Sequence, residues 1–220
     1  MIIENNGRIV CFTRRIWYNV RMKTTIQRRM RQEVARGRPL VREELIRRGF
    51  RGNTLSEMTA RGVLYRVAQG VYAPCAGAAS EWFDYELASK VVPQGVFTLF
   101  SALRLHGLTD ENPQRMTMAI PTNAHPVKSA LPISFVYMKP DLLARDVVEK
   151  TSNGTALRVF TVERTLAECI KHRNKIGIDV AVAALREATQ KGLVDFAQLG
   201  RALLSCRMLR IAQPYLEGLS

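Results

Sequence analysis

The side chains that could carry out acid–base or metal chemistry are few and scattered along this chain. The three histidines are His106, His125 and His172, and their separation excludes a local metal-binding motif. The four cysteines form no C-x-x-C pair, and their spacing fits no zinc pattern. His106, in the stretch LRLHGL, is expected to hold the end of a helix rather than to catalyse a reaction.

Motifs that bind phosphate or activate a nucleophile are also missing. The sequence contains no H-E-x-x-H, P-loop, G-x-G-x-x-G or G-x-S-x-G motif. It has no D/E-x-K for a metal-dependent nuclease and no D-x-D pair for a nucleotidyltransferase. Glu163 and Arg164 point in different directions on a helix, so Glu163 is expected only to favour a helix N-terminus after Thr161. The sequence therefore predicts no enzyme, no catalytic residue, no metal site and no cofactor.

The charge of the chain indicates a different chemistry, which is the binding of polyanions. Its 220 residues carry 33 Lys and Arg against 19 Asp and Glu, a formal net charge of +14. Residues 24–73 alone hold eleven basic and four acidic side chains, whereas residues 74–220 hold 17 and 14. Such asymmetry is typical of a nucleic-acid-binding part joined to a more neutral part.

Nine residues are candidates for contact with DNA. Arginines suit phosphates because they stay charged, whereas polar side chains can hydrogen-bond to base edges. The expected phosphate or groove contacts are Arg28, Arg42, Arg51, Arg61 and Arg66, and the expected base contacts are Asn53, Thr54, Ser56 and Gln69.

Two helices are predicted at the start of this basic region. Ile26, Met30 and Val34 recur at i, i+4 and i+8, which predicts one buried stripe of a helix. The segment VREELIRRG predicts a short second helix, because acids occupy its first turn and arginines its last. Leu45 and Ile46 are expected to face inward from it.

A third helix and a hairpin are expected to follow. The helix is predicted to begin at Asn53 or Thr54, with Thr54 and Glu57 forming a capping box. The segment VLYRVAQGVYAP predicts a hairpin with Gly70 in its turn. This order predicts a winged helix-turn-helix over residues 24–75, in which the third helix enters the major groove. A winged helix used only for protein contacts is the alternative, and the local charge disfavours it.

The remaining segments flank this predicted domain. Residues 1–23 are expected to be a poorly ordered basic extension, with a DNA-contacting arm around Trp17 and Tyr18 as the alternative. After a linker of small residues at 74–80, residues 81–220 are predicted to form a separate mixed α/β domain with a small sheet and a helical tail. The predicted fold class is thus α/β (α+β).

The helical tail is predicted from apolar stripes. One of them consists of Phe196, Leu199 and Leu203, and a last short helix is expected to begin near Pro214. No apolar run approaches the roughly 18 residues of a membrane span. The cysteines are expected to be free, mostly buried thiols, and with no secretory signal this predicts a cytoplasmic protein.

Four stretches of the second domain resemble the AbiEi family of antitoxins, from bacterial type IV toxin–antitoxin and abortive-infection systems. In order they are SALRLHGLT (101–109), VFTVERTLAEC (159–169), IGIDVAVAALREA (176–188) and PYLE (214–217). The winged-helix region is similar in RPLVREELIRRGF and RVAQGVYAP, so the resemblance covers about residues 25–219. Glu168 stands where the family often has Asp.

The resemblance implies a repressor that binds double-stranded DNA in the promoter of its own operon. It also implies that the second domain counteracts an AbiEii-type nucleotidyltransferase toxin, without implying direct contact between the two proteins. Arg164 and Glu217 lie inside the family-like motifs and are candidates for partner contact, with helix-capping or internal salt-bridge roles as the alternative. The competing hypotheses are a plain winged-helix transcription factor, whose second domain senses a ligand or dimerises, and an enzyme acting on nucleic acid.

Overall fold

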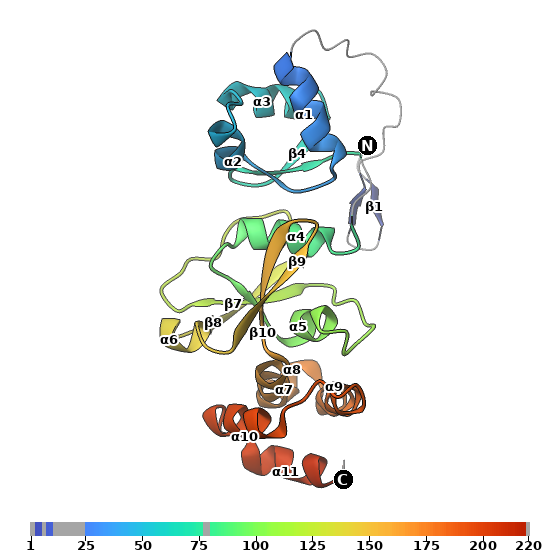
Figure 1. Cartoon of the computed structure of the whole chain (residues 1–220), viewed down its shortest axis with the longest axis vertical. Helices are drawn as coiled ribbons and strands as arrows, with labels where there is room; N and C mark the ends of the chain where they lie inside the picture. Colours follow the sequence, from blue (N-terminus) through green and yellow to red (C-terminus); the bar gives the residue numbers. More distant parts are fainter. Residues whose placement is uncertain (1–2, 6–7, 11–24, 77–79, 219–220) are drawn as a thin grey trace. The chain divides into compact units, whose positions relative to one another are not determined.

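The chain is a mixed α/β protein in a computed structural model that describes residues 3–5, 8–10, 25–76 and 80–218 (Figure 1). The predicted arm residues Trp17 and Tyr18 lie outside the described residues. Contacts divide the chain into two compact units. Unit 1 consists of Met1–Pro93, Pro126–Pro132 and Thr151–Ala156, and unit 2 of Gln94–His125, Ile133–Lys150 and Leu157–Ser220.

Unit 1 combines helices with two small antiparallel sheets. Strands β1 and β2 pair with each other, and a three-stranded sheet has the order β3-β5-β4. In chain order the elements are β1 (Ile3–Asn5), β2 (Arg8–Val10), α1 (Thr25–Ala35), β3 (Leu40–Val41), α2 (Arg42–Arg47), α3 (Gly52–Ala60), β4 (Leu64–Ala68), β5 (Val71–Pro74) and α4 (Phe83–Val91).

The core of unit 1 forms where the helical stripes meet this sheet. Met30 and Val34 of α1 are fully buried, as their spacing predicted. Gly70 lies in the turn between β4 and β5 with a φ of 75°, a conformation that glycine adopts without steric cost. The buried cluster comprises Met30, Val34, Leu40, Leu45, Phe50, Leu55, Met58, Leu64 and Tyr72.

Two local predictions for α2 and α3 are wrong. Ile46 is 47% exposed, because the six-residue helix α2 turns only Leu45 into the core and adjacent residues point about 100° apart. The capping box does not form, because α3 begins at Gly52 and its N-cap is Arg51, which makes no side-chain cap. Thr54 is therefore a residue of the first turn, and its N–H donates to the Arg51 carbonyl at 3.1 Å.

Segments from much later in the chain complete unit 1. The Ala130 N–H donates to the Val67 carbonyl at 2.8 Å. The Ser152 hydroxyl donates to Glu86 at 2.7 Å, and Arg38 donates to the Asn153 carbonyl at 3.4 Å. Residues 126–132 and 151–156 therefore belong to the same packing unit as the first 93 residues.

Unit 2 is built on a sheet with the strand order β8-β7-β6-β10-β9. Strands β7 and β8 are parallel, β6 and β7 antiparallel, and β10 and β6 parallel. Its elements up to the sheet's last strand are β6 (Val96–Phe97), α5 (Leu99–Leu105), β7 (Met116–Pro121), β8 (Ile133–Met138), α6 (Pro140–Leu143), β9 (Val147–Ser152) and β10 (Thr155–Phe160).

A group of helices, coloured brown to red in Figure 1, forms the tail of unit 2. It buries one apolar cluster that includes Leu166, Ile170, Leu185 and Leu203. Its members are α7 (Val162–Lys171), α8 (Arg173–Ile176), α9 (Ile178–Gln190), α10 (Phe196–Ser205) and α11 (Leu209–Glu217).

The tail departs from the sequence prediction at two positions. Phe196 is 53% exposed although it was assigned to the buried stripe of Leu199 and Leu203. The last helix begins at Leu209 and contains Pro214 in its interior, because the N–H groups of Ile211 and Ala212 donate to the Met208 carbonyl and form a turn before Pro214.

Two simpler expectations concern membranes and thiols. The longest helix in the described part of the chain, α9, has 13 residues, and none of the described helices could span a bilayer. Cys169 and Cys206 are free and buried, and Cys75 is half-buried. Cys11 lies outside the described residues.

Candidate functional site

The predicted DNA-contacting residues of unit 1 are almost all on its surface. Thr54 is the half-buried exception, because it lies in the first turn of α3 next to the buried Leu55. The exposed ones are Arg28, Arg42, Arg51, Asn53, Ser56, Arg61, Arg66 and Gln69.

Arg42 connects three of the elements that carry these residues. It is the first residue of α2, and its N–H donates to the carbonyl of Gly70 in the β4–β5 turn at 2.8 Å. A Cβ placed on Gly52, the first residue of α3, would lie 3.2 Å from the Arg42 guanidinium. The start of α2, the start of α3 and the turn next to Gln69 therefore lie side by side.

The other arginines are placed at the ends of elements. Arg51 is the N-cap and Arg61 the C-cap of α3, so a cation stands at each end of this helix. Arg66 lies on β4, and its Nε donates to the carbonyl of Ala68 at 3.3 Å. Arg28 lies on α1, and no described contact joins it to the group around Arg42.

Ion pairing separates the basic residues of unit 1 into two kinds. Glu33 pairs with Arg36 at 2.8 Å and with Arg48 at 3.2 Å, and Glu44 pairs with Lys90 at 2.8 Å. In contrast, the described residues supply no acidic partner for Arg28, Arg42, Arg51, Arg61 or Arg66. Uncompensated, exposed guanidinium groups attract phosphate oxygens.

Glu57 changes the character of the exposed side of α3. It is exposed, and its carboxylate accepts a hydrogen bond from the Asn53 amide at 3.4 Å. The sequence assigned Glu57 to a capping box, but at i+4 from Asn53 it stands beside the expected base contact. A carboxylate there repels nearby phosphates and gives the Asn53 amide a hydrogen-bond partner within the same helix.

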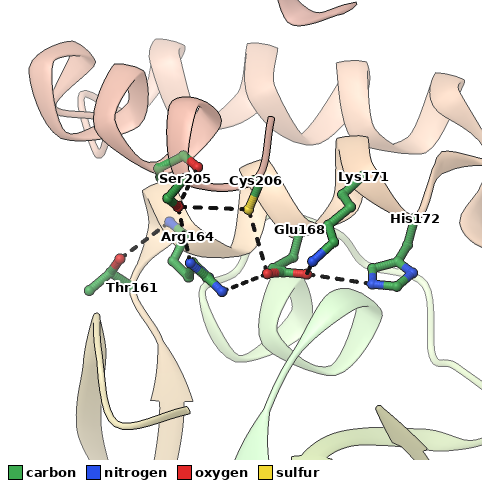
Figure 2. A network of polar contacts seen from close by, with 8 residues as sticks. Thr161, Arg164, Glu168, Lys171, His172, Ser205 and Cys206 are labelled. Carbon is green, nitrogen blue, oxygen red and sulfur yellow. Dashed lines mark hydrogen bonds and ion pairs between the residues drawn. The ribbon is translucent and has the colours of Figure 1, made fainter. Parts of the chain in front are cut away.

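A second polar site lies inside unit 2, on helix α7. Glu168 is fully buried, and its carboxylate pairs with Arg164 at 2.7 Å (Figure 2). The other oxygen lies 3.5 Å from Lys171 and 3.5 Å from His172, and the Cys206 thiol donates to Glu168 at 3.6 Å. We call this group the Glu168 network.

The charge state of the network follows from its contacts. Burial alone would raise the pKa of Glu168, but the hydrogen bond from His172 and the charges of Arg164 and Lys171 outweigh it and lower that pKa. Burial, reinforced by the Glu168 charge, raises the pKa of the Cys206 thiol. The carboxylate is thus ionised and the thiol protonated at neutral pH, which is the reverse of what a nucleophilic cysteine needs.

Arg164 is held in place on several sides. Its side chain is 5% exposed, its backbone N–H donates to the N-cap hydroxyl of Thr161, and its guanidinium donates to Ser205 at 3.3 Å. The guanidinium also lies 5.5 Å from the ring centre of Phe160. Arg164 therefore forms an internal ion pair, which was one of the alternatives to partner contact considered from the sequence. Glu217 is exposed on α11 and accepts from Gln213 at 3.0 Å.

The three histidines stay apart. His106 is the C-cap of α5, and its Nε2 donates to the Phe160 carbonyl at 2.7 Å, so it fixes the helix end as expected. Burial lowers the pKa of His106. His125 lies in an exposed loop, and in the described residues no three His, Cys, Asp or Glu side chains gather as a metal site would require.

One buried acid was missed by the sequence analysis. Glu86 of α4 is fully buried and accepts hydrogen bonds from Ser80 and Ser152, each at 2.7 Å. Glu86 lies three residues after Phe83, on the apolar side of the helix, and this spacing could have predicted its burial.

Comparison with known proteins adds no relative to this picture. No family model matches the chain. No curated protein is significantly similar to it in sequence either.

Proposed function

We propose that the chain is a DNA-binding transcriptional repressor, with α1–α3 and the β3-β5-β4 sheet acting as a winged helix-turn-helix. The order helix, short helix, helix and hairpin is the one that this motif requires. The observation that carries the proposal is the set of exposed arginines around α2, α3 and β4 that have no acidic partner among the described residues.

In this proposal α3 enters the major groove. Asn53 and Ser56 are exposed on it and can meet base edges, whereas Thr54 is half-buried and contributes less. Arg42 and Arg66 contact phosphates from the preceding helix and the hairpin. Glu57 then restricts which bases Asn53 can contact, because the Asn53 amide must break its hydrogen bond to the Glu57 carboxylate or share it with the base.

The test is a binding titration of full-length variants on the promoter of the chain's own operon and on a scrambled duplex. Arg42→Ala and Arg66→Ala should weaken binding to both duplexes and reduce the slope of log affinity against log salt by roughly 0.9 each. Asn53→Ala should weaken promoter binding by about 1–3 kcal/mol and leave scrambled DNA nearly unaffected.

Arg36→Ala is the matched control, because Arg36 is already paired with Glu33 at 2.8 Å. It should change neither affinity nor salt slope by more than a small fraction. If Asn53→Ala and Arg66→Ala gave the same pattern on both duplexes, α3 would not lie in the major groove.

We further propose that the protein is the antitoxin of a nucleotidyltransferase toxin of the AbiEii type. Support comes from the resemblance of the 101–109, 159–169, 176–188 and 214–217 stretches to AbiEi antitoxins. These stretches form parts of α5, α7, α9 and α11, whose apolar side chains meet in one cluster.

The antitoxin proposal is tested by co-expression with the protein encoded next to the chain's gene. Arg42→Ala/Arg66→Ala should lose promoter repression and still rescue cells from the toxin, because antitoxin action is assigned to unit 2. If the neighbouring gene encodes no nucleotidyltransferase, the second candidate function, a plain winged-helix transcription factor, replaces it. The uncompensated arginines favour that candidate equally.

A further inference from the structure

Helix α10 carries a second apolar stripe that faces away from the core. Phe196 is 53% exposed and Leu204 is 61% exposed, with Gly200 midway between them. Leu199 and Leu203 on another face of the same helix are buried in the unit 2 cluster. Large apolar side chains aligned on an exposed helix face are a frequent mark of an interaction surface.

The fold of the single chain does not explain why residue 200 is a glycine. Glycine is among the poorest helix formers, and it lies in the interior of α10. A Cβ at this position would meet nothing within 4 Å. Since no neighbour among the described residues requires the missing side chain, an approach from outside the chain explains it.

We infer that α10 docks against α10 of a second copy, antiparallel and around a two-fold axis at Gly200. Phe196 and Leu204 are each four residues from Gly200, so this arrangement sets Phe196 of one copy against Leu204 of the other. The surface is then self-complementary, as a two-fold interface must be. The two glycines face each other and let the helices approach closely.

The charges at the ends of α10 fit the same arrangement. Asp195 caps the start of the helix by accepting from the N–H groups of Ala197 and Gln198, and Arg207 follows its end. An antiparallel pairing brings Asp195 of one copy close to Arg207 of the other, and it opposes the two helix dipoles. No charged residue lies in the Phe196–Gly200–Leu204 stripe.

The exposed stripe is small compared with the roughly 800 Å² per partner of a standard interface. The dimer is therefore expected to be weak and concentration-dependent. This inference goes beyond the proposed function and does not rest on it, because it uses only α10 and its flanks.

The experiment is sedimentation equilibrium of the full-length protein over a wide concentration range. The wild type should shift from 24.8 kDa toward twice that mass as concentration rises. Leu204→Glu should weaken the association at least about tenfold, because it would bury a charge against Phe196. Ala183→Glu, which adds a charge at an exposed position of α9 outside the stripe, should leave it unchanged.

Two further variants test the position of the axis. Gly200→Ala should raise the melting temperature of the dilute monomer by about 2–4 °C through helix propensity, and yet weaken the dimer. Gly200→Cys in a Cys11→Ser/Cys75→Ser background should form an intermolecular disulfide, which needs Cα atoms within about 7 Å, whereas Gln198→Cys should not.

The inference is overturned if the protein remains a monomer at every concentration. It is equally overturned if Leu204→Glu leaves the dimer intact or if Gln198→Cys cross-links as well as Gly200→Cys. A monomer in which Leu204→Glu abolished binding of a different protein would assign the stripe to that partner instead of a second copy.

Discussion

Replacing only one partner of the buried ion pair between Arg164 and Glu168 should strongly lower the free energy of unfolding of unit 2. The two groups are 2.7 Å apart, and their side chains are 5% and 0% exposed. Removing Glu168 leaves the Arg164 charge without an ionic partner in the interior, which typically costs about 3–5 kcal/mol, and removing Arg164 leaves Glu168 only its longer contacts with Lys171 and His172. At about 2–4 °C per kcal/mol for a chain of this size, Arg164→Met or Glu168→Leu should lower the melting temperature by roughly 6–20 °C.

The double variant Arg164→Met/Glu168→Leu should recover most of this loss. Replacing a buried pair by apolar side chains of similar volume is often neutral, because the desolvation cost disappears together with the attraction. Lys171 and His172 are 41% and 20% exposed, so water can solvate them once Glu168 is gone. The coupling energy of the two substitutions should thus be about 3 kcal/mol or more.

The chain supplies a matched control in Glu187 and Lys191. This pair has the same four-residue spacing and a distance of 2.9 Å, but its side chains are 43% and 46% exposed. A cycle of Glu187→Gln and Lys191→Met should give a coupling energy of about 0.2–1 kcal/mol. Burial is the main variable that differs between the two cycles.

The measurement is urea unfolding followed by circular dichroism, with calorimetry to identify the transition of unit 2. Because the folded pKa of Glu168 is lowered, the pair's contribution should be complete above the ordinary pKa of 4.5 and should vanish as pH falls through the folded value. Coupling no larger than that of Glu187 and Lys191 would show that the Arg164–Glu168 pair is not desolvated. Arg164 would then be hydrated and accessible to a partner.

Three further predictions concern single contacts. Because burial lowers the pKa of His106, the free energy of unfolding should decline as pH falls below 6.5, and His106→Gln should reduce that decline, as measured by urea titrations at several pH values. Thr161→Ala should lower the free energy of unfolding by about 0.5–2 kcal/mol, because it removes the side-chain N-cap of α7. Thr54→Ala removes no cap and should lower it less in the same assay, so equal losses would contradict the cap assignments. Cys169 and Cys206, whose thiol pKa values are raised by burial, should react with a thiol reagent in a Cys11→Ser/Cys75→Ser background only after unfolding, and fast labelling of the native protein would contradict their burial.

Apolar periodicity predicted the parts of the fold in which one helix face meets the core. Met30 and Val34 of α1, and Leu199 and Leu203 of α10, are buried as their spacing required. The same rule failed at Phe196, because an apolar side chain at helical spacing can lie on the protein surface as well as in the core. Strands β3 and β6 have two residues each, too few for any alternation to be visible.

The candidate site could be predicted only in part, because residue type indicates charge but not its partner. Exposure of the unit 1 arginines followed from their positions off the apolar stripes. The sequence prediction did not place Glu57 against Asn53 or bury Arg164 inside unit 2. In both cases the partner lies four residues away on the same helix, a spacing that can be seen in the sequence. It was not used, because Glu57 had been assigned to a capping box and Arg164 to a motif resembling AbiEi antitoxins.

The discontinuous composition of unit 1 has a consequence for synthesis on the ribosome. Residues 126–132 and 151–156 contribute to it, so the unit cannot close when residue 93 has been made. Its last segment ends 63 residues later, at Ala156. At about 5–20 residues per second, synthesis of these residues takes roughly 3–13 s. During this time Glu86 lacks its hydrogen bond from the Ser152 hydroxyl, and the incompletely folded unit is exposed to chaperones and proteases.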